Sequence, residues 1–212
     1  MRIGIIQASS QADKNLLLFN TVTKYAPGDE VINFGCRENE PNQYSYVEIS
    51  ILAGLLLAGK AVDFIVTGCS SGQGMMLACN SFPGVICGYA PSPTDAYLFA
   101  QINNGNAISL PLGEKYTWSG YENFEKTIAK LFSEPFGQGY PKEESSRKLK
   151  DTATLKMIRH HSQRSATELM NSLEGSFVDH LMDKHDVIRF IVKNGEPDIV
   201  RWLQSRQSVN GY

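Results

Sequence analysis

Residues 61–80 read AVDFIVTGCSSGQGMMLACN, and the type of fold can be read from this stretch. Ala61–Thr67 is an apolar run rich in β-branched and aromatic residues, which is typical of a buried strand. A turn of glycines and serines follows at Gly68–Gly74, and Gly74–Asn80 has the composition of a helix. A strand, a glycine-rich turn and a helix in this order predict one βα unit of a parallel sheet.

Strand-like and helix-like segments alternate on both sides of this unit, over residues 1–140. Such alternation predicts an α/β fold in which a parallel sheet is flanked by helices and joined by right-handed connections. The other strands are expected at Arg2–Ile6, Glu30–Phe34, Gly84–Tyr89 and Ala107–Leu110, and the other helices at Lys14–Tyr25, Val47–Leu57, Thr94–Ile102 and Tyr121–Leu131.

The chain changes character after residue 140. Phe136–Arg147 is rich in glycine, proline and charge, and indicates a linker or an extended arm. Beyond it the apolar residues fall at helical spacing, with a break at Gly195–Pro197. We therefore expect a first domain over residues 1–140 and a small α-helical C-terminal extension over residues 141–212. Residues of the extension that step by four are Leu169, Leu173, Phe177 and Leu181, and later helices carry Val187, Phe190, Ile191 and Trp202.

Composition excludes several functional classes. The 212 residues carry a net charge of −2, from 20 basic and 22 acidic side chains, which gives no reason to expect a nucleic-acid partner. Apolar runs such as Ile51–Ala58 are too short to span a bilayer, and the first ten residues, MRIGIIQASS, do not form a signal peptide. We therefore expect a cytoplasmic protein with no membrane partner.

Four cysteines occur, and no two are spaced as in CxxC zinc or redox motifs. Cys36, Cys79 and Cys87 are interpreted as small buried apolar side chains. Cys69 differs because it follows a buried strand and precedes a helix. Ligands bind at this edge of a parallel sheet, glycines admit a close backbone approach, and a helix start favours anions. We expect the helix to lower the pKa of the Cys69 thiol.

Several chemistries are compatible with a cysteine in such a turn. A Cys-x5-Arg phosphatase would need arginine where Met75 stands, and a dinucleotide fingerprint would need a third glycine. A Cys–His hydrolase needs a nearby histidine, and all four histidines lie in the C-terminal extension: His160, His161, His180 and His185. A thiolate that removes a proton from carbon needs only an oxyanion hole, which the glycine–serine turn offers with the hydroxyls of Ser70 and Ser71.

The order of motifs resembles a known family. Cys69-Ser70-Ser71-Gly72-Gln73-Gly74-Met75 is similar to the glycine-rich catalytic loop of type B ribose-5-phosphate isomerases and galactose-6-phosphate isomerase subunits. The resemblance covers about residues 1–140. It implies a Rossmann-like fold, aldose–ketose isomerisation of a sugar phosphate, a homodimer with its pocket near the subunit interface, and no metal or organic cofactor. Further matching segments are Asn33–Gly35, Pro83–Val85, Asn103–Ala107 and Phe136–Tyr140.

The resemblance also implies roles for individual residues. Cys69 would be the catalytic base, and the Ser71 hydroxyl would lie on the proton path. Gly72 and Gly74 would present backbone N–H groups to the enediolate, Asn103 would bind sugar oxygens, and Tyr44 would line the pocket.

From its position in the turn, Ser70 is expected to bind substrate as well. Three residues after the first strand, Ser9, Ser10 and Gln11, face the same sheet edge. They are expected to bind a substrate hydroxyl or to cap the first helix at Ser10, and the cap is the favoured role. The alternatives are an inert Cys69 thiol and glycines that serve only the turn.

The sequence departs from this family at several positions. Ala8-Ser9 replaces an Asp-His pair, the ring-opening histidine is missing at about Pro91, and Gly113 and Tyr140 stand where phosphate-binding arginines are expected. Without ring opening, the substrate would be a sugar that is already open-chain, such as a tetrose phosphate. An alternative is that His160 or His161 of the extension supplies the missing acid. Residues that would bind phosphate instead are Lys115, Lys142, Arg147 or Lys148.

These losses leave two other functions open. One is a non-catalytic sugar-phosphate-binding subunit of a heteromeric isomerase. The other is an unrelated cysteine-dependent transferase or hydrolase, because a fold alone does not fix the chemistry.

Overall fold

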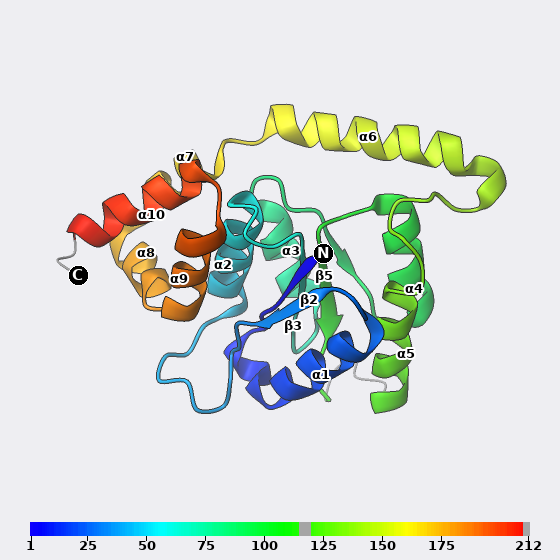
Figure 1. Cartoon of the computed structure of the whole chain (residues 1–212), viewed down its shortest axis with the longest axis horizontal. Helices are drawn as coiled ribbons and strands as arrows, with labels where there is room; N and C mark the ends of the chain where they lie inside the picture. The colour runs from blue at the N-terminus through cyan, green and yellow to red at the C-terminus, as the bar shows by residue number, and fades with distance from the viewer. Residues whose placement is uncertain (115–119, 210–212) are drawn as a thin grey trace.

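The computed structural model of the chain describes residues 1–114 and 120–209 (Figure 1). Its centre is a five-stranded sheet in the order β2-β1-β3-β5-β4, and every pairing in it is parallel. The sheet confirms the α/β fold expected from the alternating pattern. The strands are β1 (Arg2–Ile5), β2 (Glu30–Asn33), β3 (Phe64–Cys69), β4 (Cys87–Tyr89) and β5 (Ala107–Pro111).

Helices cover both faces of the sheet. Because successive side chains of a strand point to opposite faces, β3 contributes Phe64 and Val66 to one core cluster and Ile65 to the other. The first cluster contains residues of α1, α4 and α5, and the second contains residues of α2 and α3. These helices are α1 (Asn15–Tyr25), α2 (Tyr46–Ala58), α3 (Gln73–Ser81), α4 (Pro93–Leu98) and α5 (Tyr121–Leu131), with shorter turns η1 (Ser9–Lys14), η2 (Phe99–Asn103) and η3 (Lys142–Glu144).

The central strand lies further along the chain than the apolar run predicts. Ala61 and Val62 are buried, but their N–H groups donate to Leu56 O, so they belong to the turn that ends α2. At the other end, pairing with β5 continues through Gly68 and Cys69, up to the register pair Cys69–Pro111. Cys69 is therefore the last residue of β3 and not a residue of the turn.

Beyond residue 141 the described chain is helical, as predicted from the spacing of its apolar residues. The predicted linker at Phe136–Arg147 is wrong in its second half, because η3 and the start of the next helix at Ser145 lie within it. Figure 1 shows α6 running across one side of the molecule, from the end near α4 to the cluster of α7–α10. The step-of-four residues do not share one helix, because α7 ends before Leu173 and α8 begins after it. The helices are α6 (Ser145–Ser162), α7 (Ala166–Ser172), α8 (Gly175–Met182), α9 (His185–Asn194) and α10 (Pro197–Val209).

The extension packs on the outer side of α2. Its buried residues, among them Val187, Ile188 and Ile191 of α9, share one hydrophobic cluster with α2 and α3. Consequently α2 is covered on two sides, which explains why the run Ile49–Leu56 is buried throughout. The division into domains at residue 140 stays a prediction. In the described part of the chain, no helix combines the length and apolarity that crossing a bilayer requires.

Candidate active site at the carboxyl edge of the sheet

Cys69 ends β3 and is followed by the glycine-rich turn that leads into α3. Its side chain is largely buried, with 8% of the residue exposed. The turn is held from β5 and the segment after it, because Leu112 N donates to Cys69 O at 3.0 Å and Gly113 N donates to Ser70 O at 2.9 Å. Ser109 Oγ also donates to Gly72 O at 2.6 Å. The cysteine is thus fixed at the carboxyl end of the central strand, where parallel sheets bind ligands.

Gly72 has a steric reason to be glycine. Its φ is +75°, in the left-handed region, and it directly precedes α3. A Cβ there would lie 2.8 Å from the ring carbon Cε2 of Tyr89 and 2.9 Å from Leu110 O. The turn therefore needs this glycine whether or not its N–H contacts a ligand.

The segment after β1 reaches the same place. Ala8 N donates to Gly68 O at 3.1 Å, so the end of β1 lies beside the end of β3. Gln11 is buried, and its Nε2 donates to Ser70 Oγ at 3.0 Å and to Ser10 O at 2.6 Å. Of the predicted residues after the first strand, Gln11 thus contacts the glycine-rich turn directly, and Ser9 and Ser10 lie between it and the end of β1.

The prediction that Ser10 caps the first helix is wrong. Residues Ser9–Lys14 form a 3₁₀ turn that starts after Ala8, and α1 starts after Lys14; neither start has a side-chain cap. The chain turns once near Cys69 before α1 begins, and Ser10 lies inside that turn.

Tyr44 and Ser9 hold each other through two hydrogen bonds. Tyr44 N donates to Ser9 Oγ at 2.7 Å, and Ser9 N donates to Tyr44 O at 3.0 Å. The Tyr44 side chain is 2% exposed, its ring stacks on His180 at 4.9 Å, and burial raises the pKa of its hydroxyl. It therefore lies beneath the surface of this edge.

Tyr46 is the exposed aromatic residue beside the glycine-rich turn. It is 43% exposed, and a Cβ at Gly74 would lie 3.4 Å from its ring carbon Cε2. Tyr46 is not among the site residues predicted from the sequence. The sequence contains a pattern that points to it. Ser45 and Glu48 form a capping box, which predicts that α2 begins at Tyr46.

Cys36 lies next to Ser9 on the loop after β2. Burial raises the pKa of its thiol from 9.0 to about 11, and a hydrogen bond with Ser9 opposes that rise. Cys79 and Cys87 are also buried, as predicted, and the hydrogen bond with Cys79 raises the pKa of Cys87. Among the described residues, no three His, Cys, Asp or Glu side chains are placed to hold a metal ion.

Asn103 does not join these residues within one chain. It ends η2, before β5 begins at Ala107, whereas Cys69 is level with Pro111 at the end of β5. Four strand residues at about 3.3 Å each separate these levels by roughly 13 Å. Asn103 instead lines a pocket of about 390 Å³ along the edge strand β4, with Tyr89 and Asp95.

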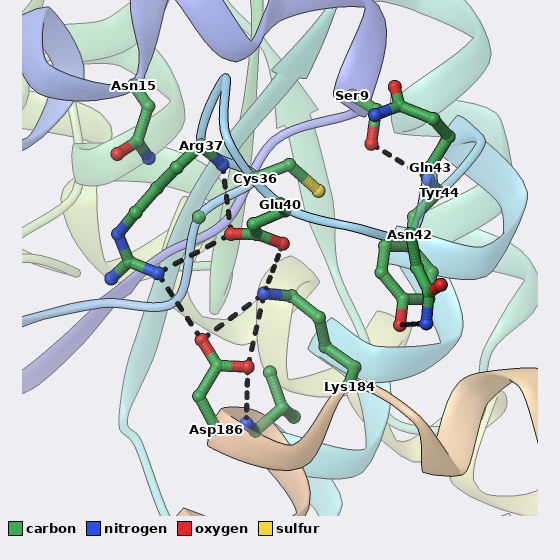
Figure 2. A network of polar contacts seen from close by, with 12 residues as sticks. Ser9, Asn15, Cys36, Arg37, Glu40, Asn42, Gln43, Tyr44, Lys184 and Asp186 are labelled. Atoms are coloured by element: carbon green, nitrogen blue, oxygen red, sulfur yellow. Dashed lines mark hydrogen bonds and ion pairs between the residues drawn. The ribbon is translucent and has the colours of Figure 1, made fainter.

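The basic residues near the site are paired with acids. Lys14, on η1, contacts Asp13 at 2.7 Å and Glu114 at 3.2 Å, and the hydrogen bond with Asp13 raises its pKa. Arg37 and Lys184 share Glu40 and Asp186 in a balanced network beside Cys36 (Figure 2).

The other basic residues considered above are located elsewhere. Arg147 pairs with Glu144 and Asp151 at the start of α6, and Lys142 and Lys148 belong to the same region. His160 lines a pocket of about 700 Å³ beside residues 104–106, where β5 begins. His161 follows it in α6, and Lys115 lies outside the described residues. The tail histidine that reaches the loop after β2 is His180, whose Nε2 lies 3.3 Å from Gln43 O.

Comparison with known proteins identifies relatives of this arrangement. A model of the family described as Ribose/Galactose Isomerase matches residues 3–151. A crystal structure of 4-deoxy-L-threo-5-hexosulose-uronate ketol-isomerase complexed with a tartrate is 33% identical, covers 100% of both chains and has a TM-score of 0.91. A ribose-5-phosphate isomerase from Vibrio parahaemolyticus is 33% identical over 97% of this chain and 99% of its own, with a TM-score of 0.90.

A more distant structure shares the fold. The type B ribose 5-phosphate isomerase from Trypanosoma cruzi is 21% identical, covers 75% of this chain and 98% of its own, and has a TM-score of 0.62. A search of curated proteins found no match.

Proposed function

The chain belongs to the ribose/galactose isomerase family, and from this premise we propose that it is an aldose–ketose isomerase in which Cys69 transfers the proton. Membership places it among the sugar isomerases, which are intramolecular oxidoreductases. One observation carries the assignment of the base: Cys69 ends the central strand, beside a glycine-rich turn and a helix start. That position combines a nucleophilic sulfur with backbone donors for an oxyanion.

The reaction proceeds through an enediolate. The Cys69 thiolate removes the proton from C2 of the open-chain aldose, and the electron pair moves to O1 through a C1=C2 double bond. The thiol then returns its proton to C1, which leaves a ketone at C2. The hydroxyl proton of O2 moves to O1 in the same process, and the Ser71 hydroxyl is the group that we assign to this path. No net oxidation occurs, because C1 is reduced as C2 is oxidised.

The developing negative charge needs donors that are already oriented. The N–H groups of Gly72 and Gly74 stand at the first turn of α3, where the helix dipole favours negative charge. Ser9, Ser10, Gln11 and Ser70 are the groups that we propose for the sugar hydroxyls. The hydrogen bond between Gln11 and Ser70 supports this grouping, because it joins the segment after β1 to the turn. For Tyr44, burial favours a role beneath the pocket wall, and Tyr46 is the better candidate for direct contact.

The substrate is proposed to carry an anionic group, and two kinds are considered. A phosphate corresponds to the ribose-5-phosphate isomerase from Vibrio parahaemolyticus. A carboxylate corresponds to the hexosulose-uronate ketol-isomerase, which matches this chain over its whole length. The ring-opening histidine of the type B family is missing at about Pro91, and this absence favours an open-chain substrate such as a uronate or a tetrose phosphate. Gly113 and Tyr140 stand where that family has arginines for phosphate, which favours the carboxylate.

We also propose that the enzyme is a homodimer whose sites are shared between chains. Asn103 ends η2, before the start of β5, whereas Cys69 is level with the end of β5, so we infer that the two residues touch one substrate where two chains meet. Helix α6 supports this proposal, because it buries none of its 18 residues within its own chain. It leaves apolar side chains exposed for a partner: Leu149, Leu155, Met157 and Ile158.

Proton NMR in D2O tests the reaction and names the substrate. The panel contains four-, five- and six-carbon aldose and ketose phosphates together with open-chain hexuronates, each with wild type and with Cys69→Ala. We expect one compound to exchange its C1 or C2 proton and to convert into its isomer. In Cys69→Ala we expect at least a thousandfold slower exchange, since the base is gone.

Other outcomes of this panel are equally informative. Exchange that persists unchanged in Cys69→Ala contradicts the assigned base. Binding of a sugar phosphate without any exchange would favour a non-catalytic subunit of a heteromeric isomerase. A stable acyl- or phospho-cysteine adduct at Cys69 would favour a transferase or hydrolase, because an isomerase of this mechanism forms none.

A further inference from the structure

The loop between β2 and α2, residues 34–45, is anchored to the site at both ends. On the β2 side, Gln7 Nε2 donates to Cys36 O at 2.6 Å, and Cys36 N donates to Gln7 O at 3.3 Å. On the α2 side, Tyr44 is joined to Ser9 by the two hydrogen bonds described above. The conformation of this loop therefore fixes the position of Ser9, which lies beside the end of β3.

The middle of the loop depends on one carboxylate. Glu40 Oε1 accepts from Arg37 N at 2.9 Å, inside the loop. Glu40 Oε2 accepts from Lys184 Nζ at 2.8 Å, and this lysine is 144 residues away in the sequence. Figure 2 shows Lys184 standing between Glu40 and Asp186, with Arg37 on the far side of both acids.

Lys184 belongs to the extension, in the turn between α8 and α9. Its side chain is 5% exposed, and Asp186 of α9 holds its Nζ at 3.1 Å. Asp186 also lies 3.5 Å from Arg37. Lys184 lies beyond residue 151, where the match to the family model ends, so this contact is added to the family's fold by the extension.

Docking of the extension does not by itself require this buried charge. Apolar contacts already join the two parts, among them Phe34 and Phe190, whose ring centroids are 5.1 Å apart, and the cluster around α9. A buried ion pair contributes little net stability because desolvation offsets attraction, whereas it can specify one geometry among several. The geometry specified here is that of the loop.

His180 of α8 is a second residue of the extension that contacts the loop. Its ring stacks on Tyr44, and its Nε2 lies 3.4 Å from Glu48 Oε1, at the start of α2. The extension thus contacts the loop at its middle and at its α2 end.

We propose that Lys184 is a positioning residue for the isomerase site: through Glu40 it holds the 34–45 loop in place, and the loop in turn holds Ser9 beside Cys69. The kinetic part of this inference rests on the proposed function. The structural part does not, because Cys36 reports on the loop directly. Cys36 is 1% exposed within the loop, whereas Cys79 is 0% exposed in α3 and reports on global opening.

The test compares Lys184→Met with Lys184→Arg and with Lys60→Met. Lys60 provides a control, because it also pairs with the extension, at 2.6 Å from Glu196, but it is exposed and lies at the opposite end of α2 from the loop. Iodoacetamide labelling of Cys36 and Cys79 is followed by peptide mass spectrometry, and kcat and KM are measured with the sugar identified by NMR. In Lys184→Met we expect Cys36 to label at least tenfold faster with Cys79 unchanged, and KM to rise at least tenfold with a smaller change in kcat. Lys184→Arg should restore most of the protection of Cys36 and most of the wild-type KM. Lys60→Met should resemble wild type in labelling and in kinetics.

Protection of Cys36 that survives in Lys184→Met overturns the proposal, and so does faster labelling with unchanged kcat and KM. If Lys184→Met does not fold, Glu40→Gln is tested instead, because it removes the charge on the loop side of this ion pair and leaves Lys184 paired with Asp186. The same two readouts then apply. A wild type that converts no sugar contradicts the proposed function alone. Cys36 labelling still supports or overturns the role of Lys184 in that case.

Discussion

At the scale of single residues, burial sets the chemistry of the cysteines. Cys36 and Cys69 both lie at the carboxyl edge of the sheet, one on the loop after β2 and one at the end of β3. Cys36 sits below Ser9 with a thiol whose pKa is raised by burial, so it stays protonated and unreactive at neutral pH. Two cysteines at the same edge of the sheet can therefore have different roles: Cys36 is a buried, protonated side chain of the loop, and Cys69 is the proposed base.

The raised pKa of Cys36 predicts a specific pH dependence of stability. The folded state keeps the proton up to about pH 11, whereas the unfolded chain loses it near pH 9.0. The stabilisation is thus complete below pH 9.0 and is lost as the pH rises to about 11. At about 1.4 kcal/mol per pKa unit, wild type should lose roughly 2–3 kcal/mol relative to Cys36→Ala across this window. Urea unfolding of both proteins from pH 8 to pH 11 measures the difference, and a constant difference would contradict the prediction.

At the scale of elements, α2 is the helix that connects the sheet to the extension. Its residues Ile49–Leu56 are buried all round, because β3 and α3 lie on one side and α7 and α9 on the other. Gly54 is the point of closest approach to the segment after α3. A Cβ there would lie 2.3 Å from Cγ of Phe82, a fully buried residue.

Gly54→Ala should therefore destabilise the protein although alanine is the better helix former. The helix propensity gain is at most about 1 kcal/mol, whereas overpacking a core costs about 1–3 kcal/mol. We expect a lower free energy of unfolding and a lower Tm by calorimetry. Gly175→Ala is the control, since a Cβ at that position of α8 meets no atom within 4 Å. An equal or higher Tm for Gly54→Ala would mean that Phe82 can move away freely.

At the scale of the whole molecule, α6 lies beside the segments that lead into β4 and β5 without being buried. Its own-chain contacts are polar: Thr152 Oγ1 donates to Ile102 O, Lys156 Nζ to Asn104 O, and Arg159 to Val85 O. Most of the stability of a helix in a protein comes from packing of its apolar face, so the exposed apolar residues of α6 favour a partner chain.

Light scattering tests the proposed dimer. Wild type should have twice the 23.5 kDa mass of one chain, and Leu155→Glu with Ile158→Glu should have the mass of one chain. Leu16→Glu, which changes a leucine that is 67% exposed on α1, should remain dimeric. Shared sites add a second readout, because two inactive variants, Cys69→Ala and Asn103→Ala, should regain activity when they are unfolded and refolded together. A monomeric wild type, or no recovery in the mixture, contradicts shared sites.

The parallel sheet, its helices and the position of the glycine-rich turn could be predicted from the sequence. These features are local: apolar runs, glycines and capping residues act on neighbours along the chain, so the spacing of residues 61–80 is enough to predict a strand, a turn and a helix. The same local information places the start of β3 three residues too early. Ala61 and Val62 are apolar, as strand residues are, but they belong to the turn that follows α2.

The contacts between residues far apart in the sequence could not be predicted and depend on how the whole chain packs. Lys184 and Glu40 are ordinary charged residues in sequence, and nothing local marks a partner 144 positions away. Tyr44 and Tyr46 differ by two positions, yet packing against His180 buries the first and leaves the second exposed beside Gly74. Asn103 follows the expected motif, but the register of β5 separates it from Cys69 of its own chain. Packing and register are properties of the whole chain, and for that reason the sequence pattern could indicate the chemistry without fixing the walls of the site.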